Sequence, residues 1–253
     1  MDLGIKGKKA IVNGGSSGMG KGAVLALAKE GVEIFVSARG EKRLVRSCEE
    51  ISQLTDTLIT PIVADHSTDK GRELILSMCP EPDIFIGTCA PPTFTGDFHL
   101  VNNDAWTETL SIALQGPVQF MNEILPGMCE RKWGRVVNIA TAAAKYPSAA
   151  RILSGPPRAA LVNYTVAVSK EVAVEMCNGL LSKNNANLGI SVSGIMGPSS
   201  DNTSKSIGLV WSCIKHKDII EIFQFELNGS RQENRETTAE NIIIKLYDFI
   251  NEL

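Results

Sequence analysis

Short apolar runs rich in Val, Ile and Phe alternate along the chain with longer segments whose apolar residues recur at helical spacing. The short runs predict β-strands and the longer segments predict α-helices. Strands that alternate with helices are typical of βαβ units, in which a parallel sheet carries helices on both faces. The pattern therefore predicts an α/β fold.

The strands expected from this pattern lie at residues 10–12, 33–36, 57–63, 83–86, 135–139 and 189–192. The expected helices cover residues 23–28, 41–52, 104–130, 158–181 and 238–253. A length of 253 residues is common for one α/β domain, so we expect a single domain over residues 1–253. Residues 197–236 break the rhythm, and a long irregular segment in a compact domain is usually a binding loop or lid. This segment is expected to cover the substrate.

Composition narrows the class of partner. The formal net charge is -3 and no long Lys/Arg run occurs, which argues against a nucleic acid or an anionic membrane surface as the partner. No apolar run is long enough for a membrane span, and the first residues lack a signal-peptide pattern, so a cytoplasmic location is expected. Six scattered cysteines without a C-x-x-C pair and three scattered histidines predict neither a disulfide framework nor a metal site. A small-molecule substrate fits this composition.

The most specific motif is a glycine-rich turn, Gly14-Gly15-Ser16-Ser17-Gly18-Met19-Gly20, which follows the first strand and opens the first helix. Glycines there allow a tight bend and a close approach to a pyrophosphate, which the N-terminus of the helix attracts. The alternative is a tight strand-to-helix turn that binds no ligand. The strand before the turn and the helix after it favour a dinucleotide site.

The spacing Gly14-x-x-x-Gly18-x-Gly20 resembles that of the short-chain dehydrogenase/reductase family, with Asn13 in place of the family's threonine. The resemblance continues at Asp65 after the third strand, at the segment 134–139 and at Arg158-Ala159-Ala160. It covers about residues 5–196 and is nearest to 3-oxoacyl-ACP reductase-like members. It implies a Rossmann-like doubly wound sheet, an oxidoreductase activity, and a homodimer or homotetramer formed through the two long helices.

The resemblance also implies which residues surround the cofactor. They come from the glycine turn and from the ends of the later strands: Gly14, Ser16, Ser17, Gly18, Met19, Gly20, Arg39, Asp65, His66, Cys89, Ala90 and Arg158. Arg39 ends the second strand, where a carboxylate binds the ribose of NAD and a guanidinium matches the 2′-phosphate of NADP. No Asp or Glu occupies positions 37–39, so NADP(H) is favoured over NAD(H). A solvated arginine without a ligand is the alternative.

The catalytic positions depart from the family. The family serine falls on Thr141, which keeps the hydroxyl, while the tyrosine falls on Ser154, the lysine on Arg158 and the asparagine on Ala113. A serine hydroxyl is a far weaker acid than a phenol, so Ser154 is a poor proton donor. Arginine stays protonated, so Arg158 offers fixed positive charge and a planar set of donors but no proton shuttle. It is suited to a ribose, a phosphate or a substrate carboxylate.

Further departures lie near the reactive end of the cofactor. The family's Asn-Asn-Ala-Gly segment reads Gly87-Thr88-Cys89-Ala90, and its Pro-Gly pair reads Gly197-Pro198. No strand follows the terminal helix, so the sheet has one strand fewer than usual or residues 219–226 supply an unexpected one. The residues considered as substitute proton donors are Tyr146, Tyr164 and His99. Cys89 is interpreted as a small buried thiol, and as a nucleophile only if its thiolate is stabilised.

Three functions are compatible with this sequence. The first is an NADP(H)-dependent oxidoreductase that transfers hydride to or from a carbonyl, imine or activated alkene, with Thr141 and Ser154 orienting the substrate and Arg158 supplying charge. The second is a non-redox enzyme, such as an isomerase, cyclase, lyase or hydrolase, on the same scaffold. The third is a nucleotide-binding protein without catalysis. Because one fold hosts many reactions, the site must decide among them.

Overall fold

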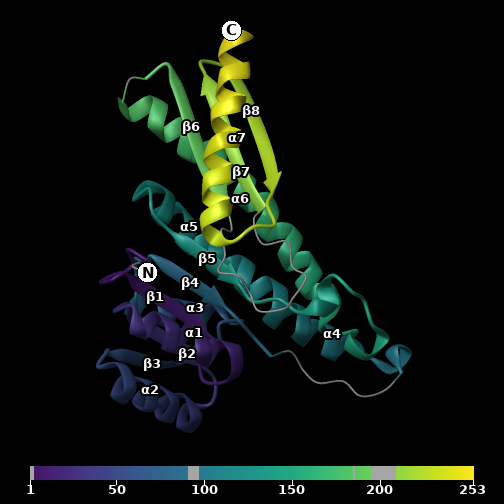
Figure 1. Ribbon diagram of the computed structural model, residues 1–253. Coiled ribbons are helices and arrows are strands. Elements are labelled where there is room, and N and C mark those ends of the chain that lie inside the picture. Colours follow the sequence, from purple (N-terminus) through teal and green to yellow (C-terminus); the bar gives the residue numbers. More distant parts are fainter. Residues whose placement is uncertain (1–2, 91–96, 185, 195–208) are drawn as a thin grey trace. The chain divides into compact units, whose positions relative to one another are not determined.

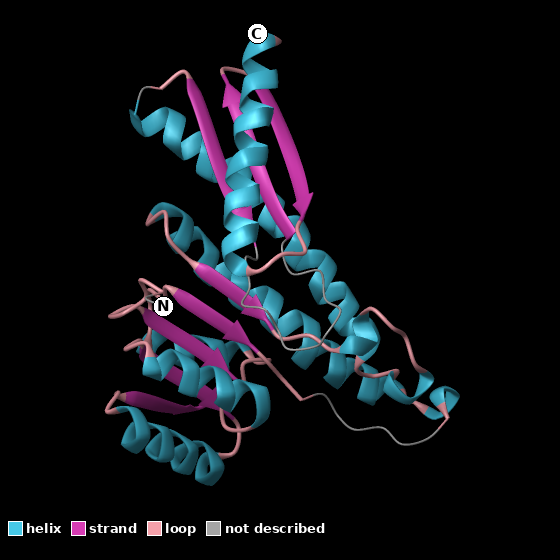
Figure 2. Ribbon diagram, viewed as in Figure 1, coloured by secondary structure: helices cyan, strands magenta, loops and turns pink. Residues whose placement is uncertain are grey.

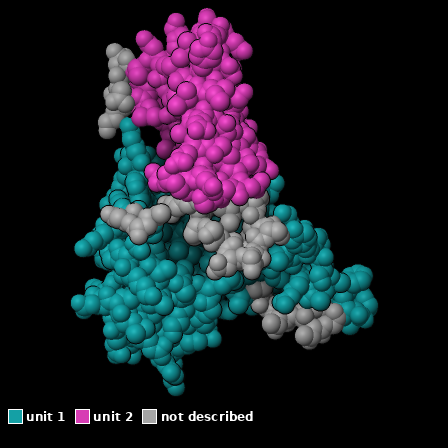
Figure 3. Space-filling view, in the orientation of Figure 1, with its two compact units in different colours: residues 1–165 teal, residues 166–253 magenta. Residues whose placement is uncertain are grey.

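The computed structural model describes the chain apart from residues 1–2, 91–96, 185 and 195–208 (Figure 1). It divides into two compact units, residues 1–165 and residues 166–253, which Figure 3 distinguishes by colour. This division differs from the single domain predicted over residues 1–253. None of the helices in the described part of the chain is both long and apolar enough to cross a membrane.

Unit 1 is built on a five-stranded parallel sheet with the order β3-β2-β1-β4-β5. The strands are β1 (Lys9–Asn13), β2 (Glu33–Ala38), β3 (Ile59–Val63), β4 (Ile84–Gly87) and β5 (Arg135–Asn138). The helices are α1 (Gly18–Lys29), α2 (Glu41–Thr55), α3 (Asp69–Met78), α4 (Asn103–Leu110), α5 (Gly116–Glu130) and the first part of α6 (Gly155–Asn184). Short 3-10 turns lie at Phe98–Leu100, Ala142–Ala144 and Ala149–Arg151.

The sheet of unit 1 is buried on both faces, because alternate strand residues pack into two separate cores. Ala10 and Val12 of β1 face α1 and α2, whereas Ile11 faces α3, α5 and α6. On this second face Phe85 of β4 stacks on Phe120 of α5, with ring centroids 4.8 Å apart. Burial on both faces is the reason that the strands read as continuous apolar runs.

The strand order places the candidate site. In an open parallel sheet a ligand binds outside the carboxyl ends of the strands, where the order of the chain reverses. Here β1 pairs with β2 on one side and with β4 on the other, so this point lies between β1 and β4. The glycine turn follows β1, and the segment containing Thr88 and Cys89 follows β4. Both segments that the sequence singled out therefore meet at this edge.

Unit 2 has a separate sheet of three antiparallel strands, β6 (Leu188–Gly194), β7 (Leu209–His216) and β8 (Ile219–Glu226), shown in magenta in Figure 2. On one face, Trp211 and Cys213 of β7 pack against Ala173 and Cys177 of α6. Helix α7 (Arg231–Asn251) packs against β7 as well. Unit 2 thus has a small core of its own.

The strand predicted at residues 189–192 is present, but the prediction that it extends the parallel sheet is wrong. It is β6, and it pairs antiparallel with β7. Its partner β7 lies further along the chain and is joined to β8 through Lys217 and Asp218, with Lys217 at a φ of 54°. Such a tight turn forms an antiparallel hairpin. β8 is the extra strand that the sequence offered as an alternative at residues 219–226.

Three predicted boundaries change. The helix expected over residues 104–130 is interrupted by a π-helical segment, Ser111–Gln115. The terminal helix begins at residue 231 rather than 238, because Ser230 and Glu233 form a capping box. Within the segment 197–236 that was predicted to be a lid, residues 209–216 and 219–226 are strands, and residues 197–208 lie outside the described part of the chain.

Candidate cofactor site and active site

The turn after β1 brings the backbone of two loops into close contact. A Cβ added at Gly14, whose φ is 72°, would lie 2.4 Å from the carbonyl oxygen of Thr88. A Cβ added at Gly20 would lie 2.4 Å from the carbonyl oxygen of Gly14. Gly18 also has a positive φ, 55°, but its Cβ would meet open space. Glycine is therefore required at Gly14 and Gly20 by packing, and at Gly18 by backbone conformation.

The N-terminus of α1 is open to an anion. Ser17 precedes the helix with an extended backbone and makes no side-chain capping bond, and the first turn contains no acidic residue. The first backbone N–H groups of a helix have no partner inside the helix and carry partial positive charge. Ser16 is buried and Met19 is 66% exposed. The turn presents what a pyrophosphate requires.

Asn13, which replaces the family threonine, is buried at the end of β1. Its Oδ1 accepts a hydrogen bond of 2.6 Å from the Ser37 hydroxyl. Its Nδ2 is buried and has no partner among the described residues. The sequence pattern singled out Asn13 but predicted no role for its Nδ2. Asn13 lines a small cavity together with His66, Thr88, Cys89 and Arg158.

An open cleft of about 500 Å³ lies beside the ends of β2 and β3. Arg39 and Asp65 line it, and their guanidinium nitrogen and carboxylate oxygen are 3.9 Å apart. The opposite wall comes from α4 and the π-helical segment and includes two carboxylates, Asp104 and Glu108. These acidic residues were not among those predicted from the sequence, although their i, i+4 spacing puts them on one helix face.

The carboxylate of Asp65 is fixed by the turn that follows β3. Its Oδ1 accepts hydrogen bonds from the Ser67 backbone N–H at 3.0 Å and from the Ser67 hydroxyl at 2.7 Å. Burial alone would raise the pKa of Asp65, but the hydrogen bonds from Ser67 and the nearby charges of His66 and Arg39 outweigh it, so the pKa is lowered. Asp65 is therefore ionised at neutral pH beside Arg39.

Replacing Ser67 by alanine should reduce the contribution of the Asp65 carboxylate to the free energy of unfolding. Because the folded-state pKa of Asp65 is lowered, its contribution is present above its unfolded pKa of about 3.9 and is lost as the pH falls through the folded value. Loss of the hydroxyl donor should lower the free energy of unfolding by about 1 kcal/mol at neutral pH, and the difference from the native chain should vanish in acid. Denaturant unfolding across this pH range measures it.

Ser77→Ala is a suitable control for that comparison, because the exposed Ser77 hydroxyl donates to the uncharged carbonyl of Leu74. Its effect should not vary with pH. A difference between the native chain and Ser67→Ala that persists unchanged at low pH would contradict the role given to the Ser67–Asp65 hydrogen bond.

His66 follows Asp65 and is a wall of the small cavity. Its Nε2 lies 3.2 Å from the carbonyl oxygen of Ile112 in the π-helical segment. Burial is the main cause that lowers the pKa of His66. The imidazole is therefore neutral at neutral pH, and the contact with Ile112 holds the loop after β3 against the start of the long helical region.

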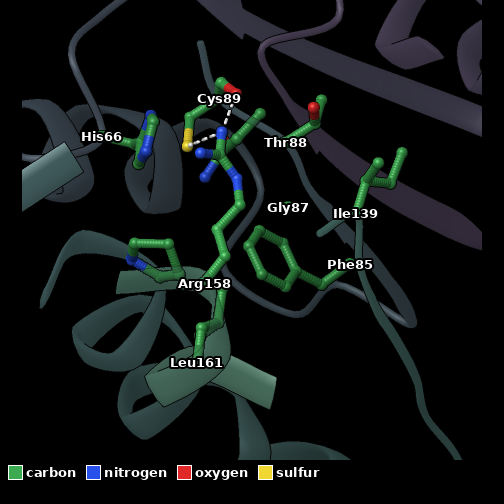
Figure 4. A pocket seen from close by; sticks show the side chains of 10 residues that line it. His66, Phe85, Gly87, Thr88, Cys89, Ile139, Arg158 and Leu161 are labelled. Atoms are coloured by element: carbon green, nitrogen blue, oxygen red, sulfur yellow. Dashed lines mark hydrogen bonds between the residues drawn. The ribbon is translucent and has the colours of Figure 1, made fainter. Parts of the chain in front are cut away.

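Arg158 contacts both Ser154 and Cys89, as Figure 4 shows for Cys89. Nη2 of Arg158 donates to the Cys89 carbonyl oxygen at 2.6 Å and to the Cys89 sulfur at 3.4 Å. Nη1 donates to the Ser154 hydroxyl at 3.1 Å and to the Ser154 carbonyl oxygen at 3.4 Å. The two residues that the resemblance places at the family's tyrosine and lysine positions thus contact each other.

Opposing effects act on the pKa of the Cys89 thiol. Burial is the largest of them and raises the pKa of its thiol, whereas the charges of Arg158 and Arg39 and the hydrogen bond from Arg158 lower it. Burial prevails, so the thiol is neutral at neutral pH. This result favours the interpretation of Cys89 as a buried thiol over that of a nucleophile.

Thr141 and Ala113 are the remaining residues that the resemblance places in the family's catalytic set. Thr141 precedes the 3-10 turn at Ala142–Ala144, and its Oγ1 accepts a hydrogen bond from the Ala143 N–H at 3.4 Å. Ala113 is fully buried within the π-helical segment. π-helical segments often mark functional sites. The π-helical segment is present here, but alanine stands where the resemblance places the family's asparagine.

The three side chains considered as substitute proton donors lie elsewhere in unit 1. Tyr146 is 58% exposed, and the Lys145 ammonium lies over its ring. The Tyr164 hydroxyl donates to Asn122 of α5 at 2.6 Å. His99 is exposed beside Phe98. None of them lines the two cavities described above. Gly197-Pro198 lies outside the described residues.

The family model of the short chain dehydrogenases matches residues 8–182. The chain therefore belongs to the short-chain dehydrogenase/reductase family, a family of oxidoreductases. Among curated proteins, it is 30% identical to the uncharacterized oxidoreductase YvaG of Bacillus subtilis over 152 residues, which are 58% of this chain and 56% of YvaG. It is 25% identical to the 3-oxoacyl-[acyl-carrier-protein] reductase FabG of Pseudomonas aeruginosa, with 67% of this chain and 70% of that protein covered.

Solved structures give the same fold. The crystal structure of L-sorbose reductase from Gluconobacter frateurii, complexed with NADPH and L-sorbose, matches with a TM-score of 0.65 at 23% identity. The match covers 70% of this chain and 68% of that chain. The chain thus spans little more than half of the length of YvaG and about two thirds of the length of L-sorbose reductase.

A second family model, that of the CinA C-terminal domain, matches residues 151–250 and overlaps the first over residues 151–182. Its matched region includes β6, β7, β8 and most of α7, which are the elements of unit 2. The part of the chain in which the sequence pattern departed from the βαβ rhythm is therefore similar to a different family.

Proposed function

We propose that unit 1 binds NADP(H) and that the protein is a divergent oxidoreductase of its family. The observation that carries this proposal is the turn between β1 and α1, where Gly14 and Gly20 permit close backbone approach and α1 begins without a side-chain cap. Arg39 would hold the 2′-phosphate, and Asp65 and Ser67 would border the adenine in the open cleft. The L-sorbose reductase structure contains NADPH, which agrees with this assignment.

The nicotinamide ring of a bound cofactor would supply or accept the hydride. The residues of this chain would position the substrate. The Ser154 hydroxyl accepts a hydrogen bond from Arg158, which would leave its own proton available to a substrate oxygen. Thr141 would contribute a second hydroxyl, and the positive charge of Arg158 would stabilise negative charge that develops on that oxygen. Because neither hydroxyl is a good acid, the proton would come from solvent or from the substrate.

The direct test is NADPH consumption with a panel of ketones, oxo acids, imines and activated alkenes, using NADPH deuterated at the transferred position. We expect slow turnover of at least one class, with deuterium recovered in the product. Ser154→Ala should turn over the substrate more slowly than the native chain does, while its NADPH affinity should equal that of the native chain. Tight NADPH binding without turnover of any compound would overturn the redox assignment and leave the nucleotide site intact.

A non-redox function is the second candidate, and the contact between Ser154 and Arg158 favours it. A buried guanidinium that donates to the Ser154 hydroxyl resembles a site that stabilises an oxyanion rather than one that exchanges a proton. Turnover that persists after the nucleotide has been removed would support this candidate. A Ser154→Ala, Arg158→Ala double variant with full biological activity would instead support a binding protein without catalysis.

We also propose that residues 166–253 form a separate module, in place of a substrate lid at residues 197–236. The support for this module is its own antiparallel sheet, its own small core and its similarity to the CinA C-terminal domain. Under this proposal unit 1 contains the whole oxidoreductase site. The strands β7 and β8, which lie within residues 197–236, belong to the separate module and do not cover the substrate.

A further inference from the structure

Arg158 is a buried cation without a described counter-ion. Arg158 is 5% exposed. Its four hydrogen bonds go to uncharged atoms of Ser154 and Cys89. Among the ion pairs formed by the described residues, none includes Arg158. Burying a charge is unfavourable unless an opposite charge is paired with it, so this guanidinium is prepared for an anion.

The walls of the small cavity are also suited to an anion. No described residue that lines it is acidic; its lining is Asn13, His66, Phe85, Gly87, Thr88, Cys89, Pro117, Ile139, Arg158 and Leu161. Asn13, which is 1% exposed, provides a second donor there, because its Nδ2 has no described partner. Cys89 does not neutralise Arg158, since burial raises the pKa of its thiol and keeps it uncharged.

The hydrogen-bond lengths indicate how an anion would enter. The cavity holds about 10 Å³, which is room for about one water molecule. The Arg158 contact with the Cys89 carbonyl oxygen is short, at 2.6 Å, whereas those with Ser154 are 3.1 and 3.4 Å. A ligand would replace the longer contacts, because charge-assisted bonds to a carboxylate are stronger than bonds to a hydroxyl. Release of Ser154 leaves its hydroxyl for an adjacent carbonyl oxygen.

We propose that Arg158 is the anchor for a substrate carboxylate, and that the substrate is a short 2- or 3-oxo acid. This inference rests on the proposed oxidoreductase function and names its substrate class. The planar guanidinium matches a planar carboxylate, and a carboxylate needs less room than a tetrahedral phosphate beside a cavity of about 10 Å³. The carbonyl must be close to the carboxylate, because the Ser154 hydroxyl lies 3.1 Å from the guanidinium nitrogen that would hold the acid.

The test measures the unfolding midpoint of the full chain without nucleotide, in oxamate, acetate or inorganic phosphate, against chloride at equal ionic strength. Oxamate and acetate should raise the midpoint of the native chain by a few degrees and leave that of Arg158→Met unchanged. Arg158→Lys should keep part of the shift. Arg43→Met is the matched control, because Arg43 is exposed on α2, and it should behave as the native chain does.

Equal carboxylate shifts in the native chain and Arg158→Met, no shift in either, or a phosphate shift that exceeds the carboxylate shift and is lost in Arg158→Met would each overturn the proposal. If Arg158→Met does not fold, the comparison of the native chain with Arg158→Lys decides, because a lysine lacks the planar pair of donors and should bind oxamate about tenfold more weakly. Since nucleotide is absent, failure of the NADP(H) assignment does not affect this result. In the NADPH-consumption assay, a 2-oxo acid should be turned over faster than its methyl ester.

Discussion

Replacing Gly14 by alanine should reduce the affinity for NADPH at least about a hundredfold. The added methyl group would lie 2.4 Å from the Thr88 carbonyl oxygen, an atom of the backbone that cannot rotate away. The φ of 72° adds strain of about 1–3 kcal/mol for a residue with a Cβ. Relief of both requires that the loops after β1 and β4 separate, which displaces the N–H groups that would face the pyrophosphate. Fluorescence titration with NADPH measures the loss.

Gly22→Ala is the matched control for this substitution. Gly22 lies two residues into the same helix beyond Gly20, and a Cβ there has nothing within 4 Å. Alanine in the helix should raise stability by up to about 1 kcal/mol and leave NADPH affinity unchanged. Circular dichroism should show that both variants fold. Normal NADPH affinity in folded Gly14→Ala would contradict the role of the turn.

Replacing Arg39 by alanine should weaken NADPH binding about tenfold and leave NADH binding nearly unchanged. A hydrogen bond to a charged group contributes about 1.5–3 kcal/mol, and the lower end applies because the Arg39 side chain is 59% exposed. Arg39 is the one cation that lines the open cleft among the described residues, and three carboxylates line it as well. Without Arg39, no described cation of the cleft would offset these three carboxylates beside the 2′-phosphate. Paired titrations with NADPH and NADH measure the change.

Two further variants sharpen this result. Arg43→Ala removes a nearby exposed arginine and should leave both affinities unchanged. Asp65→Asn removes the carboxylate 3.9 Å from Arg39 and should improve NADPH binding relative to NADH binding, since it removes a competitor for the guanidinium. A parallel loss of NADPH and NADH affinity in Arg39→Ala would mean that Arg39 supports the fold of the cleft rather than selecting the cofactor.

The first half of the fold follows from the sequence because its signals are local. The strand at Ala10, the glycine turn and the helix after it are adjacent in the chain, and each is predicted by a pattern within a few residues. The fate of the strand at residues 189–192 depends instead on β7, which begins at Leu209. A short strand pattern does not identify the strand with which it pairs, so the position of β7 decides which sheet this strand joins.

The site shows the same distinction. The positions of Ser154, Arg158 and Cys89 were predicted from family spacing, and the structure joins them by direct hydrogen bonds. The unpaired Nδ2 of Asn13 was not predictable, because its lack of a partner depends on the packing of β1, β2 and β4. That no described carboxylate pairs with Arg158 was unpredictable for the same reason, since the sequence does not show which carboxylates are near a buried residue.

The most direct test of the central claim, that unit 1 binds NADP(H) through the glycine turn with Arg39 selecting the cofactor, is titration of the purified native chain with NADPH and NADH. We predict that NADPH binds and that its dissociation constant is about tenfold lower than that of NADH. Binding of neither nucleotide, or tighter binding of NADH, would contradict the account.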